Sequence, residues 1–185
     1  MFFKIISIAF FLFLNLNSHA NMILKCQAQR NKEKTASETR SLSLVHAHTK
    51  EKLNNIIYWR DGQYVEDALK KLNYFLRDHR TGDVPNYDPK VFDILYHLQK
   101  KIGNPNAFRV ICGYRCQKTN EMLRARTKGV AKKSQHLKAK AIDIQLPGTP
   151  LKILRKHALD LKAGGVGYYE KSNFIHVDTG PVRCW

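Results

Sequence analysis

Residues 164–180 read GGVGYYEKSNFIHVDTG, and this stretch decides the fold that we expect. It predicts two short strands, at residues 166–169 and 174–178, separated by residues 170–173. Strands joined by so short a segment are expected to pair as an antiparallel hairpin. The sequence therefore predicts a β-sheet in the last part of the chain.

The strand at residues 174–178 has one apolar face and one polar face. Successive residues of a strand point to opposite sides of its sheet, so Ile175 and Val177 are expected to face the core together. His176 and Asp178 then share the opposite face. This polar face is the first candidate for a functional site.

A second strand of the same character is predicted upstream, within residues 140–145. Ile142 and Ile144 face the core by the same alternation, so Asp143 faces the other way. His136 stands at the end of the loop that leads into this strand. One loop and two strands can thus bring three side chains together. They are His136, Asp143 and His176.

Two histidines and one carboxylate form a suitable ligand set for Zn²⁺, and three protein ligands leave a fourth position for water. Zinc lowers the pKa of a bound water molecule to about 7. Asp178 could act as the general base or orient a ligand histidine. On spacing alone an alternative stays open, in which both histidines are partly buried structural residues and Asp143 pairs with a lysine.

The rest of the chain alternates helical and strand patterns without an internal repeat, and this order indicates an α+β fold. The helix that begins at Asp88-Pro89 carries an N-cap and a first-turn proline, and Gly103 ends it. The other predicted segments are strands at 41–48, 55–59 and 108–112, and helices at 65–80, 119–126 and 150–161.

Residues 1–20 are expected to be a signal peptide. Lys4 precedes an apolar run at 5–14, and a small-residue pattern at 18–20 predicts cleavage near Ala20. A membrane anchor is the alternative, but the run is shorter than the roughly 20 residues that span a bilayer. The protein is thus expected to be periplasmic or secreted, with no stable membrane span.

The chain is strongly basic, with 32 lysines and arginines against 15 acidic residues and a net charge of +17. Such a charge suits an anionic partner, whether nucleic acid, anionic lipid or an acidic cell-wall polymer. The signal peptide argues against nucleic acid, so none is expected as a partner. A scattered charge can also serve solubility alone.

Four cysteines follow the predicted signal peptide, namely Cys26, Cys112, Cys116 and Cys184. Disulfides can form in an exported protein, and four cysteines allow three pairings that the sequence cannot distinguish. Metal binding by Cys112 and Cys116 is the alternative, but the histidines and the aspartate offer a better ligand set.

From Leu72 to Trp185 the chain resembles the YcbK-like murein endopeptidases, which belong with the D-Ala-D-Ala metallopeptidases and the hedgehog signalling domain in one zinc fold group. The matching segments occur in the family's order. They are LNYFLRDHRTG at 72–82, GYR at 113–115, TNEMLR at 119–124, SQH at 134–136, AIDI at 141–144, GGVGYY at 164–169 and FIHVDTG at 174–180.

The resemblance implies that the zinc ligands are His136, Asp143 and His176, and that a central antiparallel sheet is flanked by helices. It matches Arg115 to an arginine that would hold the scissile carbonyl oxygen or a substrate carboxylate. Ser134 would offer its hydroxyl to the substrate or stabilise a turn. The expected domains are a signal peptide at 1–20, a basic flexible arm at 21–40 and a zinc peptidase domain at 41–185.

Two departures from the family pattern carry expectations of their own. Cysteines stand where the family often has serine, so a disulfide is expected between Cys112 or Cys116 and Cys184. Many relatives place a glutamate three residues before the last histidine ligand, where this chain has Asn173. That departure leaves Asp178 as the candidate for the base.

The expected function is zinc-dependent hydrolysis of the peptide cross-links of peptidoglycan. A carboxypeptidase that removes a terminal D-alanine is an alternative, and so is a peptidoglycan-binding module without activity. The sequence determines neither the bond that is cut nor the oligomeric state.

Overall fold

A computed structural model describes residues 21–28, 38–127 and 129–185 of the chain. The predicted signal peptide lies outside the described residues. Residues 21–28, within the stretch expected to be a basic arm, are helical and exposed. In the described part of the chain, no helix is both long and apolar enough to cross a membrane.

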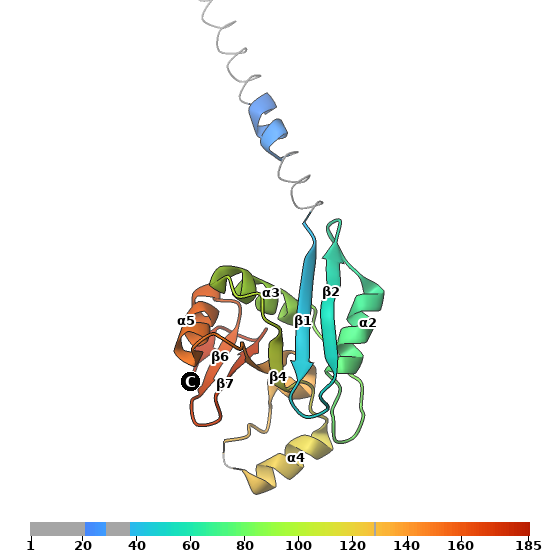
Figure 1. The fold of residues 1–185 in the computed structure, drawn as a ribbon, viewed down its shortest axis with the longest axis vertical. Coiled ribbons are helices and arrows are strands. Elements are labelled where there is room, and N and C mark those ends of the chain that lie inside the picture. Colours follow the sequence, from blue (N-terminus) through green and yellow to red (C-terminus); the bar gives the residue numbers. More distant parts are fainter. Residues whose placement is uncertain (1–20, 29–37, 128) are drawn as a thin grey trace, which may run out of the picture. The chain divides into compact units, whose positions relative to one another are not determined.

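One compact unit, Thr39–Trp59 with Tyr64–Trp185, carries the features that follow. Within the described residues, eight strands form one sheet in the order β3-β2-β1-β4-β5-β7-β6-β8 (Figure 1). The strands are β1 (Arg40–His46), β2 (Lys52–Arg60), β3 (Gln63–Tyr64), β4 (Phe108–Cys112), β5 (Ala141–Gln145), β6 (Gly165–Tyr169), β7 (Phe174–Asp178) and β8 (Arg183–Cys184).

The sheet is mixed, and with its helices it confirms the α+β class. The pairs β4–β5 and β5–β7 are antiparallel. The pair β6–β7 is also antiparallel, as the predicted hairpin requires. The pairs β1–β4 and β6–β8 are parallel. A parallel pair needs a crossover connection, and the chain between β1 and β4 supplies one with two helices.

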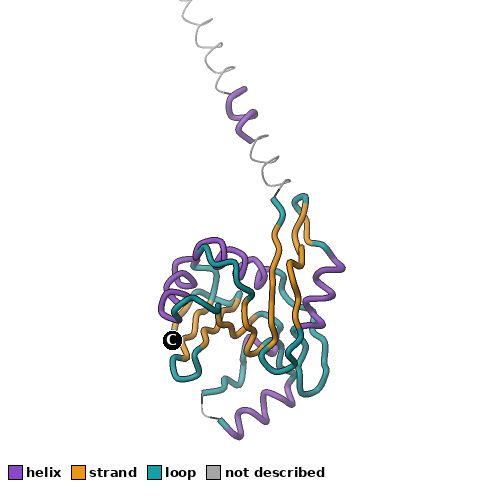
Figure 2. The backbone as a smooth tube through the Cα atoms, viewed as in Figure 1, coloured by secondary structure: helices purple, strands orange, loops and turns teal. Residues whose placement is uncertain are grey.

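The helices are α2 (Glu66–Phe75), α3 (Lys90–Ile102), α4 (Gln117–Arg126) and α5 (Leu151–Leu161), with a 3₁₀ turn η1 at Gln135–Lys138. Helices α3 and α5 contact each other, and both also contact β7. Figure 2 shows these two helices above the central strands and α4 below them. The core-facing residues predicted in β5 and β7 are all buried.

Helix α3 begins and ends where the sequence predicts. The carboxylate of Asp88 accepts a hydrogen bond from the backbone N–H of Lys90, at 3.1 Å, and so satisfies one free N–H group of the first turn. Gly103 ends the helix in the left-handed conformation, at φ 72°. Its apolar side chains at Val91 and Phe92 are fully buried.

Helix α2 ends at Phe75, five residues earlier than the predicted Arg80. The buried carboxylate of Asp78 accepts hydrogen bonds from the backbone N–H groups of Arg80 and Cys116, both at 2.9 Å. An aspartate that bonds to nearby and distant backbone groups competes with the helix ladder. These hydrogen bonds of Asp78 hold residues 76–83 in a turn instead of a continued helix.

The expected disulfide is not present, because all four cysteines lie in the described residues and each is a free thiol. Cys112 on β4 and Cys184 on β8 are four strand spacings apart in the sheet order, roughly 19 Å at about 4.8 Å each. A disulfide needs Cα atoms within about 7 Å. The sulfur of Cys116 instead accepts a hydrogen bond from the backbone of Thr119 and begins α4.

His46 is a buried polar residue at the end of β1. Its Nδ1 accepts hydrogen bonds from the backbone N–H groups of His48 and Thr49, both at 3.2 Å. Its ring contacts Phe75 and His79, with centroids 5.7 Å away in each case. Burial, followed by repulsion from His79 and His48, lowers the pKa of His46 to about 4.

We predict that the protein loses stability as the pH falls from about 6.5 toward 4. The fold keeps His46 neutral, whereas an unfolded histidine takes up a proton near pH 6.5. His46→Asn keeps an acceptor in place of Nδ1 but cannot be protonated, so its Tm should fall several degrees less between pH 7 and pH 4.5.

The Tm values are measured by circular dichroism at both pH values. The matched control is His97→Asn, on the exposed side of α3, which should follow the unmodified protein. An equal fall of Tm in His46→Asn and in the unmodified protein would show that His46 does not carry this pH dependence.

Candidate metal centre

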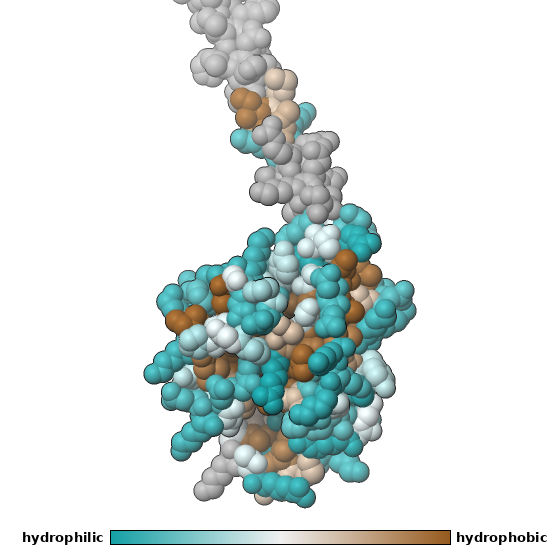
Figure 3. Space-filling model, in the orientation of Figure 1, coloured by the Kyte–Doolittle hydropathy of each residue, from teal (hydrophilic) through white to brown (hydrophobic). Residues whose placement is uncertain are grey.

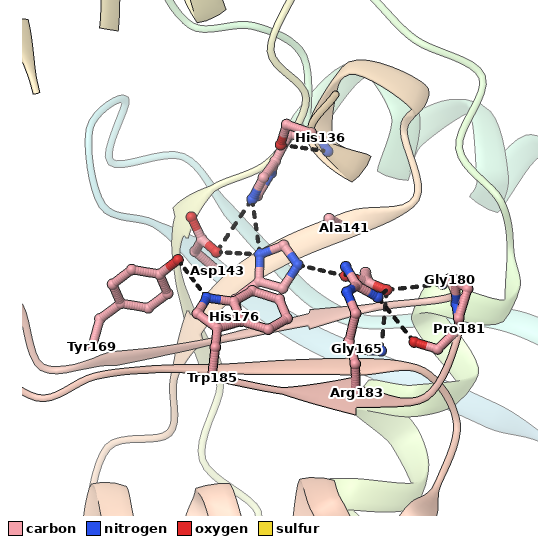
Figure 4. A network of polar contacts seen from close by, with 12 residues as sticks. His136, Ala141, Asp143, Gly165, Tyr169, His176, Gly180, Pro181, Arg183 and Trp185 are labelled. Atoms are coloured by element: carbon pink, nitrogen blue, oxygen red, sulfur yellow. Dashed lines mark hydrogen bonds and ion pairs between the residues drawn. The ribbon is translucent and has the colours of Figure 1, made fainter. Parts of the chain in front are cut away.

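The structure brings together the three side chains that the sequence singles out (Figure 4). His136 Nε2 lies 3.2 Å from Asp143 Oδ1 and 3.1 Å from His176 Nδ1. His176 Nδ1 lies 3.0 Å from the same carboxylate oxygen. All three residues are buried, so these atoms form a closed triangle of potential ligands.

The register of the sheet positions two of these residues. Asp143 on β5 is the direct antiparallel partner of His176 on β7, so both side chains leave the same face at the same level. His136 comes from η1, and Ser134 is the N-cap of this turn. The hydroxyl of Ser134 accepts a hydrogen bond from the backbone N–H of His136. A short turn just before β5 thus places the third side chain above the other two.

The size of the triangle fits a tetrahedral metal ion. Zinc binds imidazole nitrogen and carboxylate oxygen at about 2.0–2.2 Å, which places neighbouring ligand atoms about 3.3 Å apart. The separations here are 3.0, 3.1 and 3.2 Å. The residues present therefore fit a zinc ion by chemical type and by spacing.

The outer nitrogen of each histidine ring has a fixed acceptor. His136 Nδ1 donates to the carbonyl oxygen of Gly113 at 2.7 Å, and His176 Nε2 donates to Asp178 Oδ2 at 2.8 Å. A neutral imidazole carries one proton, so the inner nitrogens present lone pairs. Three acceptor atoms then face one another, and a cation among them relieves their repulsion.

The pKa values reflect this need for positive charge. Burial alone would lower the pKa of His176, but hydrogen bonds to Asp143 and Asp178 outweigh it and raise the pKa. Burial would raise the pKa of Asp143, but the two histidines hold it well below its usual range. Burial lowers the pKa of His136. The triangle thus holds one ionised carboxylate that attracts a proton or a metal ion.

Asp178 lies behind His176 and is fully buried. Its Oδ2 accepts from His176 and from Arg183 Nη2, at 2.8 and 2.7 Å. Its Oδ1 accepts from Arg183 Nη1 and from the backbone N–H groups of Gly165 and Gly180, at 3.0, 3.1 and 2.8 Å. Five donors saturate this carboxylate. Burial would raise the pKa of Asp178, but His176 and Arg183 hold it well below its usual range.

The other two predicted site residues lie together beside His136. Arg115 Nη2 donates to Ser134 Oγ at 3.1 Å, and the same oxygen accepts from the backbone of His136. Within the described residues, the Nε of Arg115 is buried and has no hydrogen-bond partner. Ser134 is itself buried, and its hydroxyl stabilises the turn that carries His136.

Gly113 is a site residue that the sequence reasoning missed. Its carbonyl oxygen fixes His136, and the backbone N–H of Tyr114 donates to the carbonyl of Leu76 at 2.9 Å. A Cβ atom at Gly113 would lie 2.7 Å from that same carbonyl oxygen. Its place in the Gly-Tyr-Arg motif was the available signal, since a close backbone approach requires glycine.

Cys112 offers a different third ligand. Its sulfur lies within 4.8 Å of ligand atoms of His136 and Asp143. Cys112 lies on β4 and is the register partner of Asp143 on β5. Burial raises the pKa of this thiol to about 12. Metals bind the thiolate, so Cys112 would have to release its proton on binding, whereas His176 already presents a lone pair.

Comparison with known proteins identifies the family of the chain. The family model described as peptidoglycan L,D-endopeptidase MepK matches residues 34–185. The peptidoglycan L,D-endopeptidase MepK of Escherichia coli K12 is 47% identical over 147 residues, which are 79% of this chain and 80% of that protein. The Shigella flexneri protein of the same name gives the same values.

The probable peptidoglycan L,D-endopeptidase MepK of Haemophilus influenzae is also 47% identical over 147 residues, 79% of this chain and 78% of its own length. No solved structure gives a significant match. The expectation of a murein endopeptidase family is confirmed: the chain belongs to the peptidoglycan L,D-endopeptidase MepK family of peptidases.

Proposed function

We propose that this protein is a zinc-dependent endopeptidase that hydrolyses peptide cross-links of peptidoglycan. The observation that carries the proposal is the triangle of inward-facing acceptor atoms on His136, Asp143 and His176. The relatives are named peptidoglycan L,D-endopeptidases, which supports peptidoglycan as the substrate class and an L,D bond as the target.

These three residues are the proposed metal ligands. Zinc bound there would act as a Lewis acid on the scissile carbonyl and would lower the pKa of a water molecule to about 7. The residues of the chain supply the geometry for this chemistry. Three protein ligands keep a fourth position open, which is the pattern of catalytic rather than structural zinc sites.

We assign Asp178 a positioning role rather than that of the general base. Its five hydrogen bonds use the lone pairs of both oxygens, and its carboxylate lies on the far side of His176 from the triangle. A carboxylate in this place fixes the tautomer of a ligand histidine and makes it a stronger ligand.

Arg115 is the proposed contact for the scissile carbonyl oxygen or for a substrate carboxylate. It lies one hydrogen bond from Ser134, whose hydroxyl in turn holds the turn of His136. Its buried Nε has a hydrogen to donate and no partner within the described residues. Because Nε is buried, the Nη groups would make the contact, and a guanidinium next to the triangle is suited to binding a developing negative charge.

We propose that the protein acts in the periplasm or outside the cell, after cleavage near Ala20. The substrate class of the relatives places their activity at the cell wall. Cleavage removes Lys4, and the remaining 31 basic and 15 acidic residues leave a net charge of +16, which would help to hold the mature protein on an anionic polymer. Figure 3 shows mostly hydrophilic side chains on the visible face of the domain, as expected for a surface in contact with water.

The first test of this proposal is loss of metal and activity in His136→Ala. The unmodified mature protein should bind one zinc per chain and convert cross-linked muropeptide dimers to monomers. The variant should lose at least about 100-fold in activity, because one of three ligands is gone. Zinc is measured by mass spectrometry and the muropeptides by chromatography, with His97→Ala as the control.

A chelator should abolish the activity of the unmodified protein, and zinc should restore it. Release of terminal D-alanine alone would instead indicate a carboxypeptidase. Zinc binding without release of any product would indicate a binding module. A folded protein that binds no metal would refute the proposed site.

The role of Asp178 is tested with Asp178→Asn. As a positioning residue, its loss should weaken zinc affinity about 10–100-fold, and excess zinc should restore much of the activity. Zinc affinity is measured by competition with a chromophoric chelator, and Asp160→Asn on α5 is the matched control. Full zinc affinity with activity still absent at saturating zinc would make Asp178 the base after all.

A further inference from the structure

A single row of residues crosses the site face of the sheet. The register pairs Cys112 with Asp143, Asp143 with His176, and His176 with Gly167. The row continues from Gly167 to Trp185, the residue that follows β8 in the chain. The backbone N–H of Trp185 donates to the carbonyl of Val166 at 3.2 Å, and the carbonyl of Trp185 accepts from the backbone N–H of Tyr168 at 2.9 Å. These two bonds place Trp185 beside Gly167.

Gly167 leaves room that the indole of Trp185 occupies. A Cβ atom at Gly167 would lie 2.7 Å from Cε2 of the indole and 2.8 Å from its Nε1. The indole thus lies directly over Gly167 and reaches the ring of His176, with centroids 5.2 Å apart at 50° (Figure 4). A large aromatic ring therefore stands next to a proposed metal ligand.

The indole is held in place but is not covered. Its Nε1 donates to the hydroxyl of Tyr169 at 3.0 Å, and the guanidinium of Arg183 lies 5.0 Å from its ring centroid. Tyr169 is itself stacked on Phe174, with centroids 4.6 Å apart. Even so, 47% of Trp185 remains exposed. A fixed, half-exposed aromatic surface beside a reaction site is suited to binding.

We propose that Trp185 forms an apolar wall of the substrate site and packs against the aliphatic part of the residue next to the scissile bond. The nearby charge of Arg183 is tied to Asp178 by two hydrogen bonds, so this wall offers apolar surface rather than a free cation. An indole face binds methyl and methylene groups by burial and dispersion. This inference rests on the proposed endopeptidase function.

The test compares Trp185→Ala, Trp185→Phe and the control Val182→Ala in the zinc-loaded protein. Val182 is an exposed apolar residue of the same segment, at 66%. With a cross-linked muropeptide dimer as substrate, Trp185→Ala should raise KM about tenfold. Its kcat should stay within about twofold, and its zinc content should be unchanged. Trp185→Phe should recover most of the loss in KM, and Val182→Ala should resemble the unmodified protein.

A fluorescence titration gives an independent readout, because the chain has two tryptophans and Trp59→Phe leaves Trp185 as the reporter. The monomer muropeptide product, added to the zinc-loaded protein, should shift the emission of Trp185 to shorter wavelength. An unchanged KM in Trp185→Ala would refute the inference, as would a product that binds without shifting the emission.

Loss of zinc from Trp185→Ala, with activity restored by excess zinc, would also refute the inference, since Trp185 would then only support His176. These outcomes are distinct from failure of the proposed function. In that case the unmodified protein would bind no zinc or would leave the cross-linked dimer intact.

Discussion

Three acceptor atoms within 3.2 Å of one another are the constraint on which the rest of the site depends. They belong to His136, Asp143 and His176, and their mutual repulsion in a buried place is relieved by a proton or a metal ion among them. The antiparallel register of β5 and β7 sets two of them opposite each other. The turn before β5 adds the third. The helices α3 and α5 pack on the sheet, so the strands that carry the site are held by the core.

Two further contacts decide which nitrogen of each ring faces inward. The carbonyl of Gly113 binds the outer nitrogen of His136, and Asp178 binds that of His176. Asp178 in turn is held by Arg183, so the segment after β7 supports the site from behind. The same segment places Trp185 beside His176. The proposed metal site and the proposed substrate wall thereby share one edge of the sheet.

Local patterns predicted the parts of the structure that local physics determines. Alternation placed Asp143 and His176 on one face, and the capping signals fixed the start and the end of α3. Long-range contacts decided the rest. Asp78 shortens α2 through a bond to Cys116, 38 residues away, and the strand order keeps Cys112 and Cys184 apart. The sequence did not single out Trp185, because its role depends on the space above Gly167, which appears only with the register.

X-ray absorption at the zinc edge of the zinc-loaded protein tests the central claim most directly, because it identifies the ligand atoms. The account predicts nitrogen and oxygen neighbours at about 2.0–2.2 Å, with the multiple-scattering signature of two imidazoles and no sulfur. A sulfur neighbour at about 2.3 Å would contradict it. Such a neighbour would mean that Cys112, and not the triangle of His136, Asp143 and His176 alone, binds the metal.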